Sequence, residues 1–289
     1  MTVIYGHRGA KGEVPENTLA SFQQCLKHGV RRCELDLHLS RDGELMVIHD
    51  PTLKRTTGHR GKVVEHDAAE LVTYDARRGG PSAVTPCPIP RLEELFQHCD
   101  FEHWQLEVKS ASKVRSARMV KAIAELAERY QLTDKVTVTS SSREVLGALQ
   151  RLTPHLQRGL VAEYAWLDPL KVAKHYGCHL LALNWTLCTP ERLLKAQKQG
   201  LHVSVWTVND AALMRRLADF CEPRQDINAI HALRQVIRSG EASPAIISDR
   251  TLYMIRPSSS WPPAGRPPQA NPFMASSSSG NPATPHPKT

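Results

Sequence analysis

The sequence predicts an α/β fold built around a parallel β-sheet, either open or closed into a barrel. Short runs of β-forming residues alternate with amphipathic helical stretches over residues 3–250, and such alternation is typical of strand–helix repeats in parallel sheets. The chain has 289 residues, 41% of them hydrophobic and 23% charged. This composition is typical of a globular protein with a sizeable core.

The expected elements can be placed in order along the chain. Nine segments have the β-rich composition of strands: 3–6, 33–39, 45–50, 103–109, 135–140, 158–163, 179–185, 202–209 and 244–249. Helical periodicity is expected over 17–29, 117–132, 189–200 and 210–220. If the sheet closes into an eight-stranded barrel, one strand candidate lies outside it. The weakest candidates are 158–163 and 179–185, and the sequence does not choose between them.

The first helix follows a turn with clear start signals. Pro15 fixes the turn, and Asn17 or Thr18 can cap the helix that follows. We favour this structural role for the turn, with a hydrogen bond of Glu16 at the edge of a nearby site as the alternative.

The composition changes abruptly at Pro257. Residues 257–289 are dominated by Pro, Ser, Ala, Gly and Asn, without a periodic apolar face. Such a segment cannot bury enough apolar surface to offset its chain entropy. We therefore expect one domain over residues 1–256 and a disordered Pro/Ser-rich tail over 257–289.

Charge and cysteine content narrow the class of protein. The net charge of +8 suits an anionic ligand, but no zinc-finger spacing, RNA-binding aromatic signature or basic stripe supports nucleic acid binding. No apolar run reaches the roughly 18 residues of a spanning helix, and no secretory signal pattern opens the chain. The seven cysteines form no C-x-x-C pair, which favours reduced thiols. We expect a cytoplasmic protein without an integral membrane segment.

Charged residues interrupt the apolar strands with a period of two. Glu34, Asp36 and His38 alternate along 33–39 and so share one face of that strand. Two neighbouring carboxylates on a buried strand repel each other unless a cation lies between them. A hard divalent ion such as Mg²⁺ or Ca²⁺ would satisfy them.

The same period recurs in the strand 103–109, where Glu107 and Lys109 share a face. His7 ends the first strand and His49 ends the third. In a parallel barrel these groups would meet at the carboxyl-terminal mouth. Two histidines beside a metal are suited to proton transfer near neutral pH.

Structural explanations of the same residues stay open. A histidine at a strand end can satisfy turn backbone groups, and Glu34 with Asp36 could belong to a structural ion-pair network. Lys109 could simply neutralise Glu107. The coincidence of complementary groups at four strand ends favours a site.

These residues stand in motifs that together resemble the glycerophosphodiester phosphodiesterases, a (β/α)8 TIM-type barrel family. The resemblance covers almost all of residues 3–250. The matching motifs, in order, are "GHRG", "PENTLASF", "ELDLHLSRDGELMVIHDPTLKRTT", "IPRLEEL", "LEVK", "VWTVN" and "IISDR".

The resemblance implies a reaction and a role for each matching residue. It implies metal-dependent hydrolysis of glycerophosphodiesters, such as glycerophosphocholine and glycerophosphoethanolamine, to sn-glycerol 3-phosphate and an alcohol. The attacking group would be water or the neighbouring glycerol hydroxyl. The implied general acid and base are His7 and His49. The implied ligands of one Ca²⁺ or Mg²⁺ ion are Glu34, Asp36 and Glu107, with Arg8 and Lys109 near the phosphate and Trp206 at the glycerol end.

Two features depart from the family pattern. A helix-like insertion is expected over 224–239, and Ser140, Ser141 and Ser142 stand where an aromatic residue is common. Both would affect the walls of the pocket rather than the catalytic groups.

Two other functions compete with this hypothesis. A related barrel phospholipase, acting on lysophospholipid or sphingomyelin-like lipids, would need an apolar lip, and no amphipathic basic helix suggests one. A catalytically inactive binding protein would be expected to lack one of the implied catalytic or metal residues, and all are present.

The tetrapeptide GHRG occurs a second time, at residues 58–61. No strand precedes this copy, so we expect His59 to lie on a solvated loop. A contact of His59 or Arg60 with an anionic substrate is the alternative.

Overall fold

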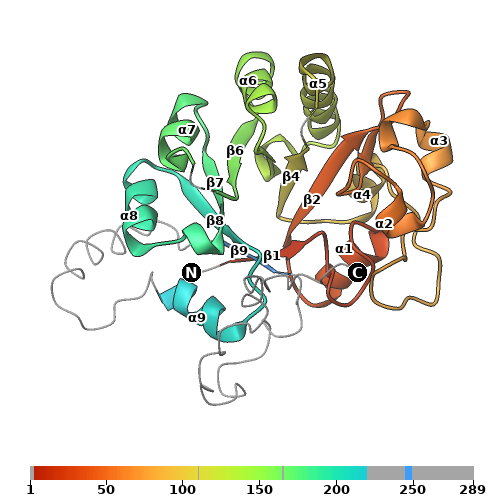
Figure 1. Cartoon of the computed structure of the whole chain (residues 1–289), viewed down its shortest axis with the longest axis horizontal. Coiled ribbons are helices and arrows are strands. Elements are labelled where there is room, and N and C mark those ends of the chain that lie inside the picture. The colour runs from red at the N-terminus through yellow and green to blue at the C-terminus, as the bar shows by residue number, and fades with distance from the viewer. Residues whose placement is uncertain (1–2, 110, 165, 220–244, 249–289) are drawn as a thin grey trace, which may run out of the picture. The chain divides into compact units, whose positions relative to one another are not determined.

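The computed structural model describes residues 3–109, 111–164, 166–219 and 245–248 (Figure 1). The helical insertion expected at 224–239, the thiol of Cys221 and the tail expected at 257–289 lie outside these residues. Five cysteines within them are buried free thiols, as expected: Cys25, Cys33, Cys87, Cys99 and Cys178. No helix in this part of the chain is long and apolar enough to cross a membrane.

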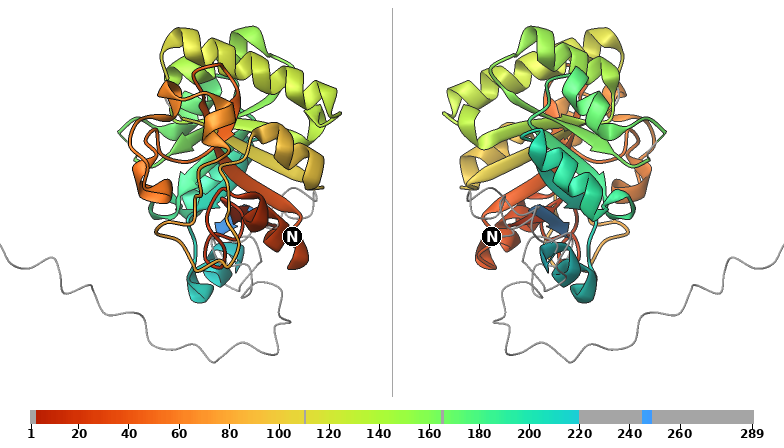
Figure 2. Two further views of the ribbon diagram at one scale, coloured as in Figure 1. Left: turned by 90° about the vertical axis from the view of Figure 1, so that its right-hand side faces the viewer. Right: turned by 90° about the vertical axis from the view of Figure 1, so that its left-hand side faces the viewer.

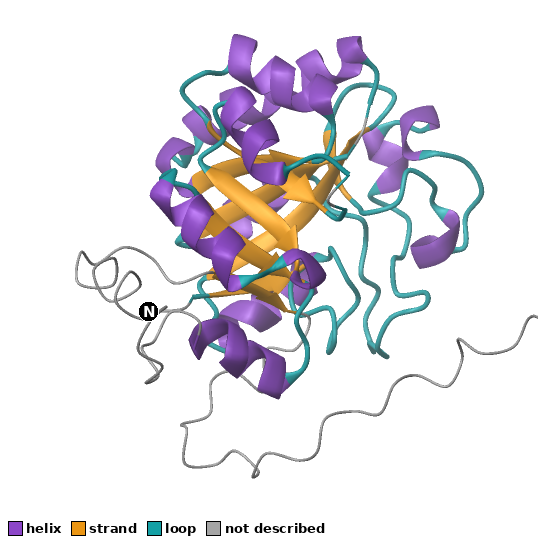
Figure 3. Cartoon of the chain, turned by 60° about the vertical axis from the view of Figure 1, so that its left-hand side comes forward, coloured by secondary structure: helices purple, strands orange, loops and turns teal. Residues whose placement is uncertain are grey.

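The described strands form a single curled sheet. Its order is β1-β9-β8-β7-β6-β5-β4-β2-β3, and β1 pairs with β2 as well as with β9. Eight strands therefore follow one another in a ring, and all neighbouring pairs in it are parallel. Figure 3 shows these strands in orange, surrounded by helices and loops. The strands are β1 (Ile4–His7), β2 (Arg32–Leu39), β3 (Leu45–Val47), β4 (His103–Val108), β5 (Val136–Ser140), β6 (Gln157–Ala162), β7 (Leu180–Asn184), β8 (His202–Trp206) and β9 (Ala245–Ser248).

The strand outside the ring is β3, which pairs only with β2 among the described strands and runs antiparallel to it. The two weakest strand candidates, 158–163 and 179–185, both lie in the ring, as β6 and β7. Only residues 40–44 connect β2 to β3. This link permits a hairpin but is too short for the crossover that parallel neighbours need.

Helices follow seven of the ring strands in the described residues. They cover the outer face of the sheet (Figure 2). The larger helices are α1 (Leu19–Lys27), α4 (Leu92–His98), α5 (Lys113–Arg129), α6 (Arg143–Leu152), α7 (Pro169–His175), α8 (Pro190–Lys198) and α9 (Ala211–Asp219). The short ones are α2 (Lys54–Thr57), α3 (Ala68–Leu71), η1 (Val63–Glu65), η2 (Thr133–Lys135) and η3 (Trp185–Leu187).

The helices are held by amphipathic faces that pack on the sheet. In α6, for example, Val145, Leu146 and Leu149 are buried while Glu144 and Gln150 remain exposed. Full burial of one such aliphatic side chain stabilises the fold by roughly 1.5–3 kcal/mol. This packing fixes the strands, so that the loops at their carboxyl ends are free to carry a site.

Residues 48–91, between β3 and α4, do not follow the strand–helix repeat, and we call this segment the excursion. They contain α2, η1 and α3, and their small apolar core includes Leu53, Leu71 and Ile89. The Ile48 N–H donates a hydrogen bond to the carbonyl oxygen of Asp36 at 3.0 Å. This bond holds the start of the excursion against the carboxyl-terminal half of β2.

Candidate active site

The loop after β1 places the first GHRG motif at the carboxyl end of the ring. Gly9 has a φ of +78°, and a Cβ atom there would lie 2.7 Å from the backbone carbonyl carbon of Ser21. Glycine alone tolerates both conditions. The Arg8 N–H donates to the carbonyl oxygen of Glu34 at 3.0 Å. The turn is thus fixed against β2, which sets the positions of His7 and Arg8.

Two residues of the turn before α1 have different roles, one in the helix cap and one in the site. Thr18 is the N-cap and accepts a hydrogen bond from the Ser21 N–H. Asn17, the other expected cap, instead donates from Nδ2 to Oδ2 of Asp36 at 2.9 Å. Asn17 is therefore part of the site.

Three carboxylates converge where β1, β2 and β4 end. Each of Glu34, Asp36 and Glu107 offers an oxygen, and the three oxygens lie within 4.8 Å of one another. Strand register explains the cluster, because His7 pairs with Glu34 and Asp36 pairs with Glu107. The donor set, three carboxylate oxygens, is one that a hard divalent cation binds.

Basic side chains surround Asp36, which is almost fully buried. Lys109 Nζ lies 2.7 Å from its Oδ1, and Arg8 Nε lies 3.1 Å from its Oδ2. Burial opposes ionisation, but Lys109 and Arg8 hold the pKa of Asp36 below its usual range. Asp36 is therefore charged at neutral pH.

The pKa values of the other two carboxylates, Glu34 and Glu107, are shifted upward instead. Burial, together with the charges of Asp36 and Glu107, raises the pKa of Glu34 well above its usual range. Burial also raises the pKa of Glu107, although Lys109 at 2.7 Å opposes this shift. The side chains of the cluster therefore do not neutralise one another fully, and a divalent cation would satisfy Glu34 and Glu107.

The two expected histidines face the same cavity. His7 is buried, with Nε2 3.8 Å from Oε2 of Glu34 and Nδ1 3.5 Å from the Thr207 hydroxyl oxygen. His49 Nδ1 lies 2.7 Å from Oδ1 of Asp50. Burial lowers the pKa of His49, against the opposing charge of Asp36. His49 is therefore mainly neutral at pH 7, as a proton acceptor must be.

A chain of hydrogen bonds joins the two sides of the site. Glu16 accepts from Arg8 Nη1 at 3.0 Å and from both Nη atoms of Arg55. Arg55 also donates to Asp50, which holds His49. The alternative of an outer hydrogen bond at Glu16 is thus confirmed, with Glu16 as the acceptor. The motif order alone gave no sign of Arg55.

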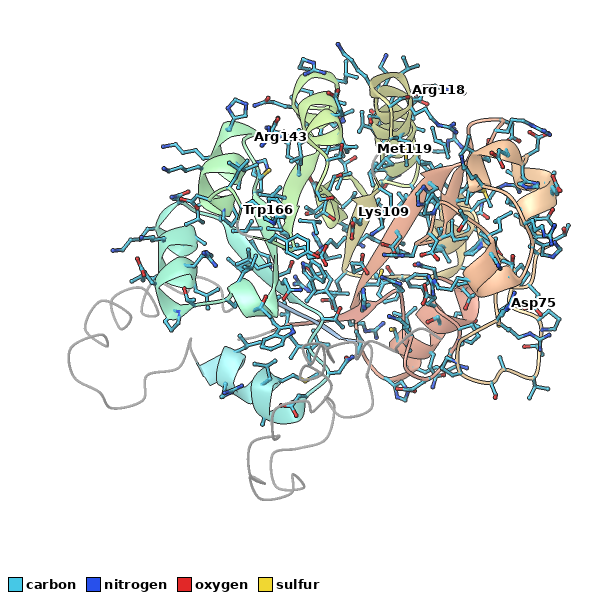
Figure 4. The ribbon with its side chains drawn as sticks, in the orientation of Figure 1. Asp75, Lys109, Arg118, Met119, Arg143 and Trp166 are labelled. Atoms are coloured by element: carbon cyan, nitrogen blue, oxygen red, sulfur yellow. The ribbon has the colours of Figure 1, made fainter. Side chains whose placement is uncertain are left out.

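The cavity at this end of the ring measures about 450 Å³. Its lining includes His7, Glu34, His49, Gln105, Glu107, Lys109, Ser141, Val161, Glu163, Trp206 and Thr207. Of the eight expected site residues, Arg8 and Asp36 are not in this lining, and they contact each other behind it. Figure 4 labels Lys109, which follows β4 toward the centre of the ring.

Other residues singled out in the sequence lie in different places relative to the cavity. Ser141 lines the cavity, whereas the Ser140 hydroxyl donates to the carbonyl oxygen of Val108 at 2.7 Å. His38 makes a hydrogen bond to the backbone oxygen of His49 and is not in the carboxylate cluster. His59 of the second GHRG copy is exposed in a loop, as expected, and stacks on Tyr74 with centroids 3.8 Å apart.

A ring of parallel strands, in which carboxylates of β2 and β4 line one cavity with His7 of β1 and His49 after β3, defines a barrel enzyme. The model of the glycerophosphoryl diester phosphodiesterase family matches residues 7–221. A glycerophosphodiester phosphodiesterase of Bacillus subtilis is 31% identical over 238 residues, covering 74% of this chain and 79% of its own length. The chain belongs to the glycerophosphoryl diester phosphodiesterase family.

Solved structures agree with this membership. A glycerophosphodiester phosphodiesterase from Agrobacterium tumefaciens aligns with a TM-score of 0.68 at 26% identity, over 88% of this chain and 99% of that one. A phosphodiesterase from Oleispira antarctica, in complex with the product sn-glycerol-3-phosphate, aligns with a TM-score of 0.71 at 23% identity. The latter alignment covers 88% of this chain and 95% of that one, and it shows a shared fold.

Proposed function

We propose that this chain hydrolyses glycerophosphodiesters, such as glycerophosphocholine and glycerophosphoethanolamine, to sn-glycerol 3-phosphate and an alcohol. The observation that carries the proposal is a cluster of three carboxylates beside two histidines, in which His7, His49, Glu34 and Glu107 line one cavity. Membership of the family supports the reaction class.

Glu34, Asp36 and Glu107 are the proposed ligands of one Ca²⁺ or Mg²⁺ ion. Their oxygens are close enough to share one ion, and their mutual repulsion is relieved by one. When bound, the ion supplies positive charge that stabilises a phosphodiester as it gathers negative charge.

His7 and His49 are the proposed general acid and base. His49 carries a lowered pKa and is oriented by Asp50, which suits it to accept a proton. His7 ends β1 and lies beside Glu34 of the neighbouring strand β2. Its ring lines the same cavity as His49. Two imidazoles can then move protons to and from the entering and leaving oxygens, whether the attacking group is water or a glycerol hydroxyl.

Three further residues are proposed to hold the substrate. Burial disfavours the charge of Lys109, but Asp36 and Glu107 raise its pKa. Lys109 therefore stays cationic and can contact the phosphate. Arg8 is held by Asp36 and Glu16 and is the second proposed phosphate contact. The buried indole N–H of Trp206 has no partner among the described residues, which leaves a donor for an oxygen at the glycerol end.

One coupled assay tests the proposed reaction. Purified protein is incubated with glycerophosphocholine or glycerophosphoethanolamine, with Ca²⁺, Mg²⁺ or EDTA, and glycerol 3-phosphate is detected with its dehydrogenase. Metal-dependent release is expected from at least one diester. No release from any glycerophosphodiester would contradict the proposal.

A lysophospholipid or sphingomyelin-like substrate is the second candidate, because the structure supplies exposed apolar side chains at the loops after β6 and β7. Trp166 is 88% exposed and Leu167 53% exposed, and Trp185 is 43% exposed. Lysophosphatidylcholine hydrolysis by the wild type, with a selective loss in Trp166→Ala, would support this candidate. Loss of glycerophosphocholine hydrolysis to the same degree would argue against a specific lipid contact.

The finer fold and location are also proposals. We propose that residues 1–256 form one complete (β/α)8 barrel, because each ring strand before β9 is followed by a helix. Residues 257–289 would be a tail without a role in catalysis, so a chain ending at Arg256 should keep its activity. Free thiols at the five buried cysteines support a cytoplasmic location.

A further inference from the structure

We propose that Glu163 binds a positively charged alcohol group of the substrate, which makes choline and ethanolamine diesters the preferred class. The inference rests on the proposed function, since it assumes that a phosphodiester occupies the cavity. It assigns a task to a carboxylate outside the residues of the proposed reaction.

The end of β6 places Glu163 in the cavity wall. Val161 lies in β6, and Glu163 follows directly after the last residue of that strand. Both line the cavity, whereas Ala162 packs in the large apolar core with the helices. The cavity therefore ends at a carboxylate on this wall.

The position of β6 in the ring separates this carboxylate from the proposed catalytic groups. Counted in either direction around the ring, β6 lies four strands from β1. Glu163 and His7 thus line the cavity from opposite strands. A substrate whose phosphate lies beside His7 and Lys109 can extend its alcohol group toward Glu163.

The charges of the two walls complement a zwitterion. Lys109 lines the cavity beside the proposed phosphate position, where its charge favours an anion. Glu163 has no ion-pair partner in the described part of the chain, and its neighbour Tyr164 donates a hydrogen bond to it at 3.1 Å. An exposed carboxylate held in this way attracts an ammonium group and leaves a neutral alcohol unaffected.

Aromatic rings stand beside the carboxylate. Tyr164 packs edge to face on Trp166, with centroids 6.3 Å apart, and Figure 4 labels Trp166 in the loop that leads to α7. Aromatic faces bind quaternary ammonium groups through cation–π attraction. The loop thus combines a carboxylate with aromatic rings, the two chemical features that bind a choline group.

The test compares four diesters in the wild type and Glu163→Gln. Glycerophosphocholine and glycerophosphoethanolamine carry cationic alcohols, while glycerophosphoglycerol and glycerophosphoinositol carry neutral ones. Glu163→Gln should lower kcat/KM for the cationic pair about two- to fivefold, the range of an exposed ion pair, and leave the neutral pair unchanged. The loss should lie in KM, because the contact exists in the ground and transition states alike.

Matched controls separate the outcomes. Glu191→Gln removes an exposed carboxylate on α8 that pairs with Lys195, and it should alter neither substrate pair. The effect of Glu163→Gln should also shrink at high salt, which screens an exposed charge.

Two results would overturn the inference. An equal loss of kcat/KM on all four diesters would place Glu163 at the glycerol end. Unchanged kcat/KM on all four would show that Glu163 does not contact the alcohol group. If the wild type turned over none of the diesters, the proposed function itself would fail.

Discussion

Arg55 donates two hydrogen bonds to the carboxylate of Glu16, at 2.7 and 3.0 Å, across a separation of 39 residues. The same guanidinium holds Asp50, whose other partner is His49. One exposed arginine of the excursion therefore links the residues that position Arg8 and His49.

Loss of this link should impair turnover without removing the metal. Arg55→Met is expected to lower kcat/KM about tenfold, as removal of an outer-shell partner commonly does. Arg55→Lys should recover only part, because an ammonium lacks the planar fork that binds two carboxylates. The neighbouring Lys54→Met, an exposed side chain on the same helix, is the control.

The pH profile provides a second readout for Arg55. Burial opposes the shift, but hydrogen bonds from Arg55 and His49 lower the pKa of Asp50 to about 2. Without Arg55 this pKa should rise toward its ordinary value near 3.9. Loss of the nearby Arg55 charge should also favour the protonated form of His49, the proposed base. The acidic limb of kcat/KM, which this base sets, should then move to higher pH in Arg55→Met. An unmoved limb with reduced activity would indicate a structural effect only.

Removal of one carboxylate should have opposite effects on metal binding and on stability. Glu34→Gln is expected to weaken Ca²⁺ or Mg²⁺ binding by about 100-fold or more in calorimetry, because one of three charged ligands is lost. The metal-free variant should melt at a higher temperature than the metal-free wild type, since burial beside Asp36 and Glu107 disfavours the Glu34 charge. A lower melting temperature would contradict the proposed repulsion.

The two histidines should separate catalysis from metal binding. His7→Ala and His49→Ala are each expected to lose about 10²–10⁴-fold in kcat, the usual contribution of a positioned acid or base. Metal affinity should be retained in both. Unchanged turnover in His49→Ala would exclude the two-histidine mechanism.

The stability of the fold should depend on pH through His103, at the start of β4. Its ring nitrogens bond to Tyr5 and Thr137, and burial lowers its pKa to about 4. Between the unfolded value near 6.5 and about 4, the unfolded chain binds more protons, so stability falls as pH falls. The full effect is about 3 kcal/mol.

Denaturant unfolding at several pH values measures this dependence. The slope of the free energy of unfolding between pH 6.5 and 4 should be smaller in His103→Gln than in the wild type. Comparison with the variant is necessary because Glu34 and Glu107, with raised pKa values, contribute the opposite slope. Equal slopes would show that His103 does not titrate abnormally.

Local pattern was sufficient for the alternating fold and for the carboxylates of β2 and β4. Period-two spacing placed Glu34 and Asp36 on one face, and the structure has both in the cluster with Glu107. These features depend on strand geometry, which a short stretch of sequence already contains. The second GHRG copy was likewise assigned to a loop because no strand precedes it.

Contacts between distant segments could be decided only by the tertiary structure. The choice of β3 as the strand outside the ring depended on which edges meet when β1 pairs with β2. The bonds of Asn17 to Asp36 and of Arg55 to Glu16 require the helix turn and the excursion to dock at the same mouth. Glu163 and His7 line one cavity only because the ring closes. Sequence determines which side chains a strand presents, whereas closure of the sheet determines which of them meet.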